Sequence, residues 1–219
     1  MKIIKYDTQK YCFGKLVKDL YQIDDLSKAH LLLREENKVG EVGHDTHTAL
    51  HTQFYGKLNS GWNEMKDLYR EFVREVVCEV FGSDQFIFQT FPSYRIQYPE
   101  NKAVTTWHYD SDALHMHPEG EINFLFPLTS AFDTNTVWME SVPGLGDFNP
   151  VELSHGECLI FNGNKCRHGN KVNKTGVTRI SLDFRILPLD RYDPNYSAVT
   201  ATKKNRFVVG EYYSSLETR

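Results

Sequence analysis

The feature that most constrains this fold is a series of short β-branched and aromatic runs that fills the second part of the chain. Gly, Pro, Asn and Asp, which favour turns, separate these runs. The expected strands are residues 86–90, 94–98, 104–109, 122–126, 135–139, 157–161, 165–168 and 178–187. About eight short strands with turns between them predict an all-β sandwich or barrel.

The residues before this series have a helical pattern. Apolar residues recur at helical spacing over 62–81, with Ser60 as the expected N-cap and Gly82 as the expected stop. A weaker helix is expected around 16–26, whereas the segment 44–51 is polar and turn-like. Helices followed by a run of strands predict an α+β, mainly β chain.

The chain length of 219 residues fits a single domain. We expect a helical flank over 1–85, a β core over 86–188 and a C-terminal tail over 189–219 that packs over the core. The sequence leaves the oligomeric state open.

Composition argues against several classes of partner. The net charge is −4 and there is no Lys/Arg run, so a nucleic-acid partner is not expected. No apolar stretch approaches the roughly 18 residues that a membrane span needs, and the first residues do not resemble a secretory signal. The four cysteines form no CxxC pair, which favours free thiols and a cytoplasmic protein.

The chemistry of the chain centres on His108 and Asp110. At the end of a strand, residues two apart project to the same face, so the imidazole and the carboxylate would converge. His168 is the best candidate for a third ligand, with His155 as a rival in a Ser-His-Gly turn. Two histidines and one carboxylate bind one face of a non-haem iron and leave positions open. Alone, however, a His-x-Asp triplet is weak evidence.

A second signal follows His168 by eleven residues. Over 179–185, apolar residues alternate with Arg179, Ser181, Asp183 and Arg185. A polar strand face can simply meet solvent. Inside a barrel, a guanidinium beside a hydroxyl suits a dicarboxylate, because Arg binds carboxylates in a bidentate manner.

These motifs together resemble the Fe(II)/2-oxoglutarate dioxygenases. Within that superfamily, the chain is similar to the branch named for a streptomycin-biosynthesis protein, close to the phytanoyl-CoA-hydroxylase-like group. The resembling stretches are 91–97, 107–112, 121–129, 135–141, 168–170 and 179–185, roughly half of the chain. The resemblance implies a double-stranded β-helix, a jelly-roll or cupin-like barrel with the N-terminal helices packed outside. It also implies Fe(II), 2-oxoglutarate and O₂ as cofactors.

The resemblance also implies roles for individual residues. His108, Asp110 and His168 match the iron ligands, and Arg179 matches the arginine that pairs with the distal carboxylate of 2-oxoglutarate. Ser181 is expected as a second contact to that carboxylate, and Asn123 as a contact to the end of the co-substrate near the metal. Weaker candidates for contacts to the co-substrate or the substrate are Arg95, Gln97, His115, His117 and Arg185, although a solvated loop is the favoured interpretation of His115 and His117. Arg185 has an alternative partner in Asp183. A second metal site at His44, His47 and His51 is a weaker alternative.

The expected function is hydroxylation of a small polar metabolite or biosynthetic intermediate. Because Asp110 keeps the carboxylate that halogenases of this superfamily lack, halogenation is disfavoured. The alternatives are a cupin-like metal-binding barrel without oxygenase activity, a protein hydroxylase and a nucleic-acid dealkylase. The dealkylase fits badly with Ser181, Asp183 and the acidic balance of the chain.

Overall fold

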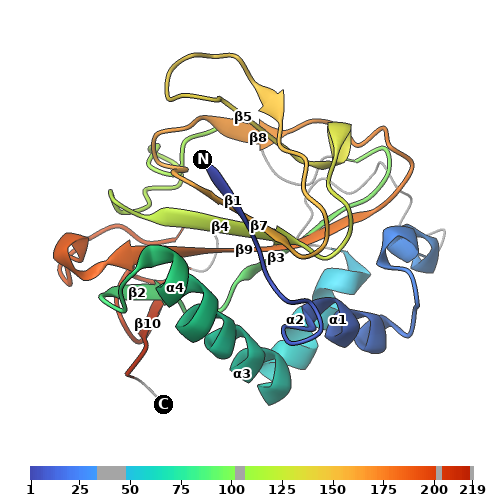
Figure 1. The fold of residues 1–219 in the computed structure, drawn as a ribbon, viewed down its shortest axis with the longest axis horizontal. Helices are drawn as coiled ribbons and strands as arrows, with labels where there is room; N and C mark the ends of the chain where they lie inside the picture. The colour runs from blue at the N-terminus through green and yellow to red at the C-terminus, as the bar shows by residue number, and fades with distance from the viewer. Residues whose placement is uncertain (34–47, 102–106, 201–203, 218–219) are drawn as a thin grey trace.

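Two antiparallel sheets dominate the protein, and its helices cover one side of the larger sheet (Figure 1). This is a computed structural model that describes residues 1–33, 48–101, 107–200 and 204–217. The strands are β1 Lys2–Lys5, β2 Phe86–Gln89, β3 Ser93–Gln97, β4 Ile122–Pro127, β5 Val137–Met139, β6 Asn149–Pro150, β7 Glu157–Phe161, β8 His168–Asn170, β9 Arg179–Pro188 and β10 Tyr213–Ser215.

The larger sheet has seven strands in the order β1-β7-β4-β9-β2-β10, with β3 also paired to β9. The smaller sheet has the order β6-β5-β8. The prediction of a mainly β chain with helices outside is therefore confirmed. Within the described residues, no pairing between strands of the two sheets closes them into a barrel.

The helical elements lie almost entirely in the first eighty residues. They are α1 Phe13–Tyr21, the 3₁₀ segment Leu26–Leu32, α2 Ala49–Asn59, α3 Asn63–Phe72, the π segment Val73–Val77, α4 Cys78–Phe81 and the short 3₁₀ turns Asp133–Asn135 and Leu189–Arg191. Among the described residues, no helix is both long enough and apolar enough to cross a membrane.

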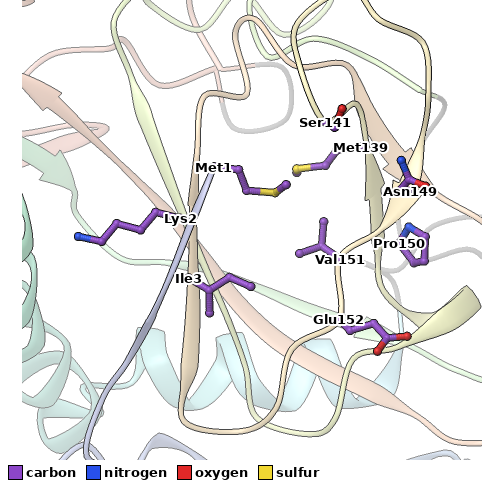
Figure 2. Close-up of a pocket in the computed structure, with 9 residues that line it drawn as sticks. All are labelled: Met1, Lys2, Ile3, Met139, Ser141, Asn149, Pro150, Val151 and Glu152. Atoms are coloured by element: carbon purple, nitrogen blue, oxygen red, sulfur yellow. The ribbon is translucent and has the colours of Figure 1, made fainter.

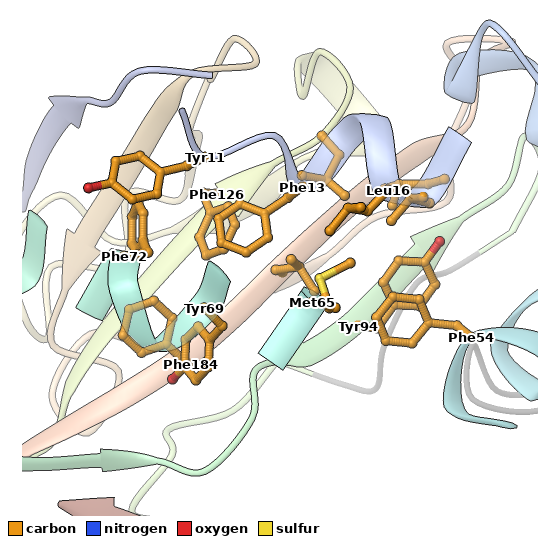
Figure 3. Close-up of a cluster of buried hydrophobic side chains, with 14 of the residues drawn as sticks. Tyr11, Phe13, Leu16, Phe54, Met65, Tyr69, Phe72, Tyr94, Phe126 and Phe184 are labelled. Carbon is orange, nitrogen blue, oxygen red and sulfur yellow. The ribbon is translucent and has the colours of Figure 1, made fainter. Parts of the chain in front are cut away.

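The core forms where the helices meet one face of the larger sheet. Rings of Phe72, Phe126 and Phe184 pack closely, and Phe54 stacks on Tyr94 with ring centroids 3.8 Å apart (Figure 3). A second, smaller cluster lies around Met139 and Phe161, which belong to the two different sheets. The larger sheet therefore has one face that binds the helices and one that faces the smaller sheet.

Most expected strands are found, with shifts at their ends. The segment expected at 135–139 begins as a strand only at Val137, because Asp133–Asn135 forms a 3₁₀ turn. The strand expected at 165–168 instead starts at His168. Of the segment 104–109, residues 104–106 lie outside the described residues, and His108 forms an isolated bridge to His168. Strands β1, β6 and β10 were not predicted.

The helix expected over 62–81 is present, and Gly82 ends it in a left-handed conformation with φ of 73°. Ser60 was wrong as its N-cap: Trp62 occupies that position, and Ser60 instead follows α2. The turn expected over 44–51 was also wrong from Ala49 onward. There Thr48 caps α2 by accepting a hydrogen bond from the amide of His51.

Candidate metal centre

His108, Asp110 and His168 meet between the two sheets. Their ligand atoms all lie within 4.8 Å of one another. The Nε2 atoms of His108 and His168 lie 3.5 and 3.7 Å from Asp110 Oδ1. These separations are long for hydrogen bonds, but two ligands that share one ion at about 2.0–2.2 Å each can stand up to about 4 Å apart.

Local backbone pairing brings these three residues together. The amide of His108 donates to the carbonyl of His168 at 2.9 Å, and the amide of His168 donates back at 3.0 Å. The amide of Asp110 donates to the carbonyl of Gly163 at 2.9 Å. As predicted from their spacing, His108 and Asp110 present their side chains to one point.

The Asp110 carboxylate is held by its far oxygen. Oδ2 accepts from Asn123 Nδ2 at 2.6 Å and from Arg185 Nε at 3.0 Å, and Arg185 Nη2 also lies 3.0 Å away. Within the part of the chain that the structure describes, the buried Oδ1 has no hydrogen-bond donor. An unpartnered carboxylate oxygen between two imidazole nitrogens is the donor arrangement that a divalent cation satisfies.

The charge states suit a metal centre. Burial alone would raise the pKa of Asp110, but the positive charge of Arg185 and the neighbouring imidazoles of His108 and His168 hold it well below its ordinary value. Burial lowers the pKa of His168, which therefore stays neutral at pH 7. With Nδ1 of His168 placed 3.0 Å from the carbonyl of Cys166, Nε2 is the nitrogen left to bind metal.

Gly163 is a site residue that the sequence reasoning missed. A Cβ there would lie 2.5 Å from Asp110 Oδ2 and 2.9 Å from the Asn123 amide. Its own amide donates to Asn123 Oδ1 at 3.0 Å. The Asn-Gly-Asn sequence at 162–164 marks a turn, but only the tertiary structure shows that a side chain at 163 would displace the carboxylate.

A second polar cluster surrounds Arg179. Its guanidinium donates to the carbonyl of Asn135 at 2.9 Å, to Ser181 Oγ at 2.8 Å and to Gln97 Oε1 at 3.3 Å. Gln97 pairs with Arg179 across β3 and β9, and all three side chains are buried. The structure thus brings Arg179, Ser181 and Gln97 together on the sheet face that also carries Arg185.

The other candidates have protein partners of their own. Arg95 Nε donates to Asp183 Oδ1 at 2.8 Å. The ring of His115 stacks on that of His108 with centroids 4.2 Å apart, and its Nδ1 lies 2.8 Å from Asp112 Oδ1. His117 Nδ1 lies 2.8 Å from Glu121 Oε2. His115 thus supports a triad residue.

The remaining histidine alternatives do not join this group. His155, the rival third ligand, packs against Gly14 of α1, where an added Cβ would lie 3.3 Å from its Nε2. His44 and His47 lie outside the described residues, and His51 is buried beside Tyr94 with its Nδ1 2.7 Å from Thr48 Oγ1.

A hollow of about 390 Å³ opens at the edge of the same inter-sheet layer, and its lining is drawn in Figure 2. Met1, Lys2 and Ile3 form one wall, and Met139 with Val151 lies opposite. No triad residue lines it. The apolar Met139–Phe161 cluster belongs to the same layer.

One curated protein matches nearly the whole chain. The streptomycin biosynthesis protein StrG of Streptomyces griseus is 30% identical over 213 residues, which cover 97% of each chain. No protein-family model matches.

Among solved structures, "CytC3 with Fe(II) and alpha-ketoglutarate" is 16% identical, with a TM-score of 0.47, over 86% of this chain and 72% of that one. AviO1 from Streptomyces viridochromogenes Tue57 is 15% identical, with a TM-score of 0.45, over 87% and 91% of the two chains.

Proposed function

We propose that this chain, which belongs to the family of the streptomycin biosynthesis protein StrG, is a non-haem Fe(II) oxygenase that uses 2-oxoglutarate. The observation that carries the proposal is the triad His108, Asp110 and His168, with its buried, unpartnered Asp110 oxygen, in the part of the chain that the structure describes. Two imidazoles and one carboxylate are the donor set of the Fe(II) facial triad.

Arg179 is the proposed anchor for the distal carboxylate of 2-oxoglutarate. Its contacts to Ser181 and Gln97 hold the guanidinium in place, and its burial strengthens an ion pair with a carboxylate. Asn123 fixes Asp110 by donating a hydrogen bond to Oδ2, the carboxylate oxygen on the side away from the two histidines. Iron and O₂ supply the oxidising power, while these side chains bind and orient.

The proposed fold is a double-stranded β-helix core over 86–188, with a helical flank over 1–85 and a tail over 189–219. Two antiparallel sheets with the triad between them support it. The proposed reaction is hydroxylation of a small polar metabolite or biosynthetic intermediate. The relationship to a streptomycin-biosynthesis protein supports a biosynthetic role, and a carboxylate at 110 supports oxygen transfer over halogenation.

Anaerobic titration with Fe(II) tests the proposal. We expect about one Fe(II) per chain and a weak visible charge-transfer band when 2-oxoglutarate is added. His108→Ala and Asp110→Ala should remove this band, because each deletes a ligand. His155→Ala is the matched control, since His155 lies outside the triad, and it should keep the band. Normal iron binding in both triad variants would rule out this site.

A further inference from the structure

Glu121 is a fully buried carboxylate that the proposed chemistry does not use. Its Oε2 lies 2.8 Å from His117 Nδ1 and 3.7 Å from Arg185 Nε. Its Oε1 accepts a hydrogen bond from the hydroxyl of Tyr213. Because a buried carboxylate is costly unless it is paired, these three contacts account for its position.

Arg185 lies between Glu121 and the metal centre. It contacts Asp110 Oδ2 through Nε and Nη2, each at 3.0 Å, and its Nη1 lies 3.6 Å from Asp183 Oδ2. The arginine therefore divides its positive charge among three carboxylates. The share that falls on Asp110 sets how much negative charge the free oxygen Oδ1 keeps for a cation.

Tyr213 connects the C-terminal strand β10 to the series of contacts that runs from Glu121 through Arg185 to Asp110. The residue belongs to β10, which pairs with β2 at the edge of the larger sheet. Its ring is fully buried with Ile87, Leu187 and Phe207. The Tyr213 hydroxyl thus has a rigid support and reaches a carboxylate 92 residues away in sequence.

We propose that Glu121 and Tyr213 are positioning residues for the metal centre. Tyr213 fixes Glu121, Glu121 draws on the charge of Arg185, and Arg185 orients Asp110 toward the two histidines. The inference rests on the proposed function, because it assumes that the triad binds a metal. It makes the last strand of the chain part of the metal centre, although that strand contributes no ligand.

Co(II) binding to the full chain tests this role, with affinity and the visible ligand-field spectrum as readouts. In Glu121→Gln the charge of Arg185 falls more fully on Asp110, so the carboxylate becomes a poorer donor. We expect Co(II) affinity to fall by about 10- to 100-fold, the usual range for partners of metal ligands, with a shifted spectrum. Tyr213→Phe removes the hydroxyl that holds Glu121 in place beside Arg185. We therefore expect it to lower Co(II) affinity and to shift the spectrum as well, by a smaller factor than Glu121→Gln.

Tyr192→Phe is the matched control. Tyr192 also lies in the tail, and its ring is 6.5 Å from that of Tyr213, but its hydroxyl accepts from the amide of Val209. This variant should bind Co(II) as the wild type does. Tyr213→Phe keeps the buried ring, so it carries the test even if Glu121→Gln fails to fold.

The outcomes separate the two proposals. If the wild type binds no Co(II), or if His108→Ala binds it normally, the triad is not the metal site and the proposed function fails. If the wild type binds Co(II) through the triad but Tyr213→Phe and Glu121→Gln keep its affinity and spectrum, the positioning role is overturned. Lower thermal stability alone, with unchanged Co(II) binding, would likewise assign these residues a purely structural role.

Discussion

The two faces of β9 differ in nearly every property although they belong to one strand. Ile180, Leu182, Phe184 and Ile186 point into the core beneath the helices. Arg179, Ser181, Asp183 and Arg185 point toward the smaller sheet, and three of these four are buried as well. A polar strand face of this kind can meet solvent, but here both faces are covered. One face is filled by dispersion contacts and the other by charge pairs and hydrogen bonds.

The two faces of β9 are therefore expected to contribute differently, one to the stability of the fold and the other to ligand binding. An apolar side chain in a close-packed core gains from burial whatever its exact partner. Buried polar groups gain only where each has a partner, so they specify positions rather than supply net stability. We therefore expect substitutions on the apolar face to act on unfolding and substitutions on the polar face to act on ligand binding.

The largest effect is expected on the apolar face. Phe184→Ala removes a ring that contacts Tyr69, Phe72 and Phe126 (Figure 3). The same ring also stacks on Phe124. The free energy of unfolding, measured by urea denaturation, should fall by about 3–5 kcal/mol. The Co(II) stoichiometry of the folded fraction should not change. Leu189→Ala, at an exposed position, is the control and should stay within about 0.5 kcal/mol of wild type. A small loss at Phe184 would mean that the core readily closes over the gap.

The next effect is expected on the polar face. Arg179→Ala should weaken 2-oxoglutarate binding to the anaerobic, metal-loaded protein by about 2–4 kcal/mol, because it leaves a carboxylate without its charged partner. Isothermal titration calorimetry measures this loss. Metal affinity should change much less, and Arg191→Ala, which removes an exposed arginine, should bind normally. Unchanged 2-oxoglutarate affinity in Arg179→Ala would show that another cation holds the co-substrate.

Periodic patterns were the part of the fold that sequence could predict. The period of two in β9 and the helical period ending at Gly82 both depend on neighbours in sequence. Strands β1 and β10 are short, and each forms because it pairs with a strand distant in sequence, β7 and β2 respectively. Their own residues therefore show no periodic pattern long enough to predict a strand. Helix α2 begins inside a polar segment because Thr48 caps it, and its apolar residues are too sparse to stand out.

The site residues likewise fall into those that the sequence could predict and those that only the folded chain reveals. The convergence of His108 and Asp110 was predicted from strand spacing, although in the structure His108 forms an isolated bridge and Asp110 lies in a turn. The pairing of Arg179 with Ser181 follows from the alternation of β9. The roles of Gly163 and Glu121 depend on contacts with residues distant in sequence: Gly163 lies against Asp110, and Glu121 lies beside Arg185. The sequence assigned Arg185 to a substrate group or to Asp183. It lies within 3.6 Å of Asp183, yet its closer partner is Asp110, which the register alone could not reveal.

The smallest effect is a difference in pH dependence at the Asp110–Arg185 pair. The pKa of Asp110 in the folded protein lies well below the ordinary value of 3.8. The unfolded chain therefore binds more protons than the folded one as the pH falls below about 4. The stability that this carboxylate contributes is fully present above its unfolded-state pKa and is lost as the pH falls through the folded-state value. Asp110→Asn cannot take part in this titration.

We expect wild type to be the more stable of the two at pH 7 in the presence of a chelator. The gap should shrink progressively below about pH 4, because Asp110 of the unfolded wild-type chain takes up a proton there while the folded carboxylate stays ionised, and Asp110→Asn has no such group. Urea denaturation of both proteins at several pH values from 7 to 3 measures it. Phe184→Leu serves as the apolar-face control, and its deficit relative to wild type should not vary with pH. A gap between wild type and Asp110→Asn that stays constant down to pH 3 would show that Arg185 does not stabilise the ionised carboxylate, and the division between the two faces of β9 would then not extend to their response to acid.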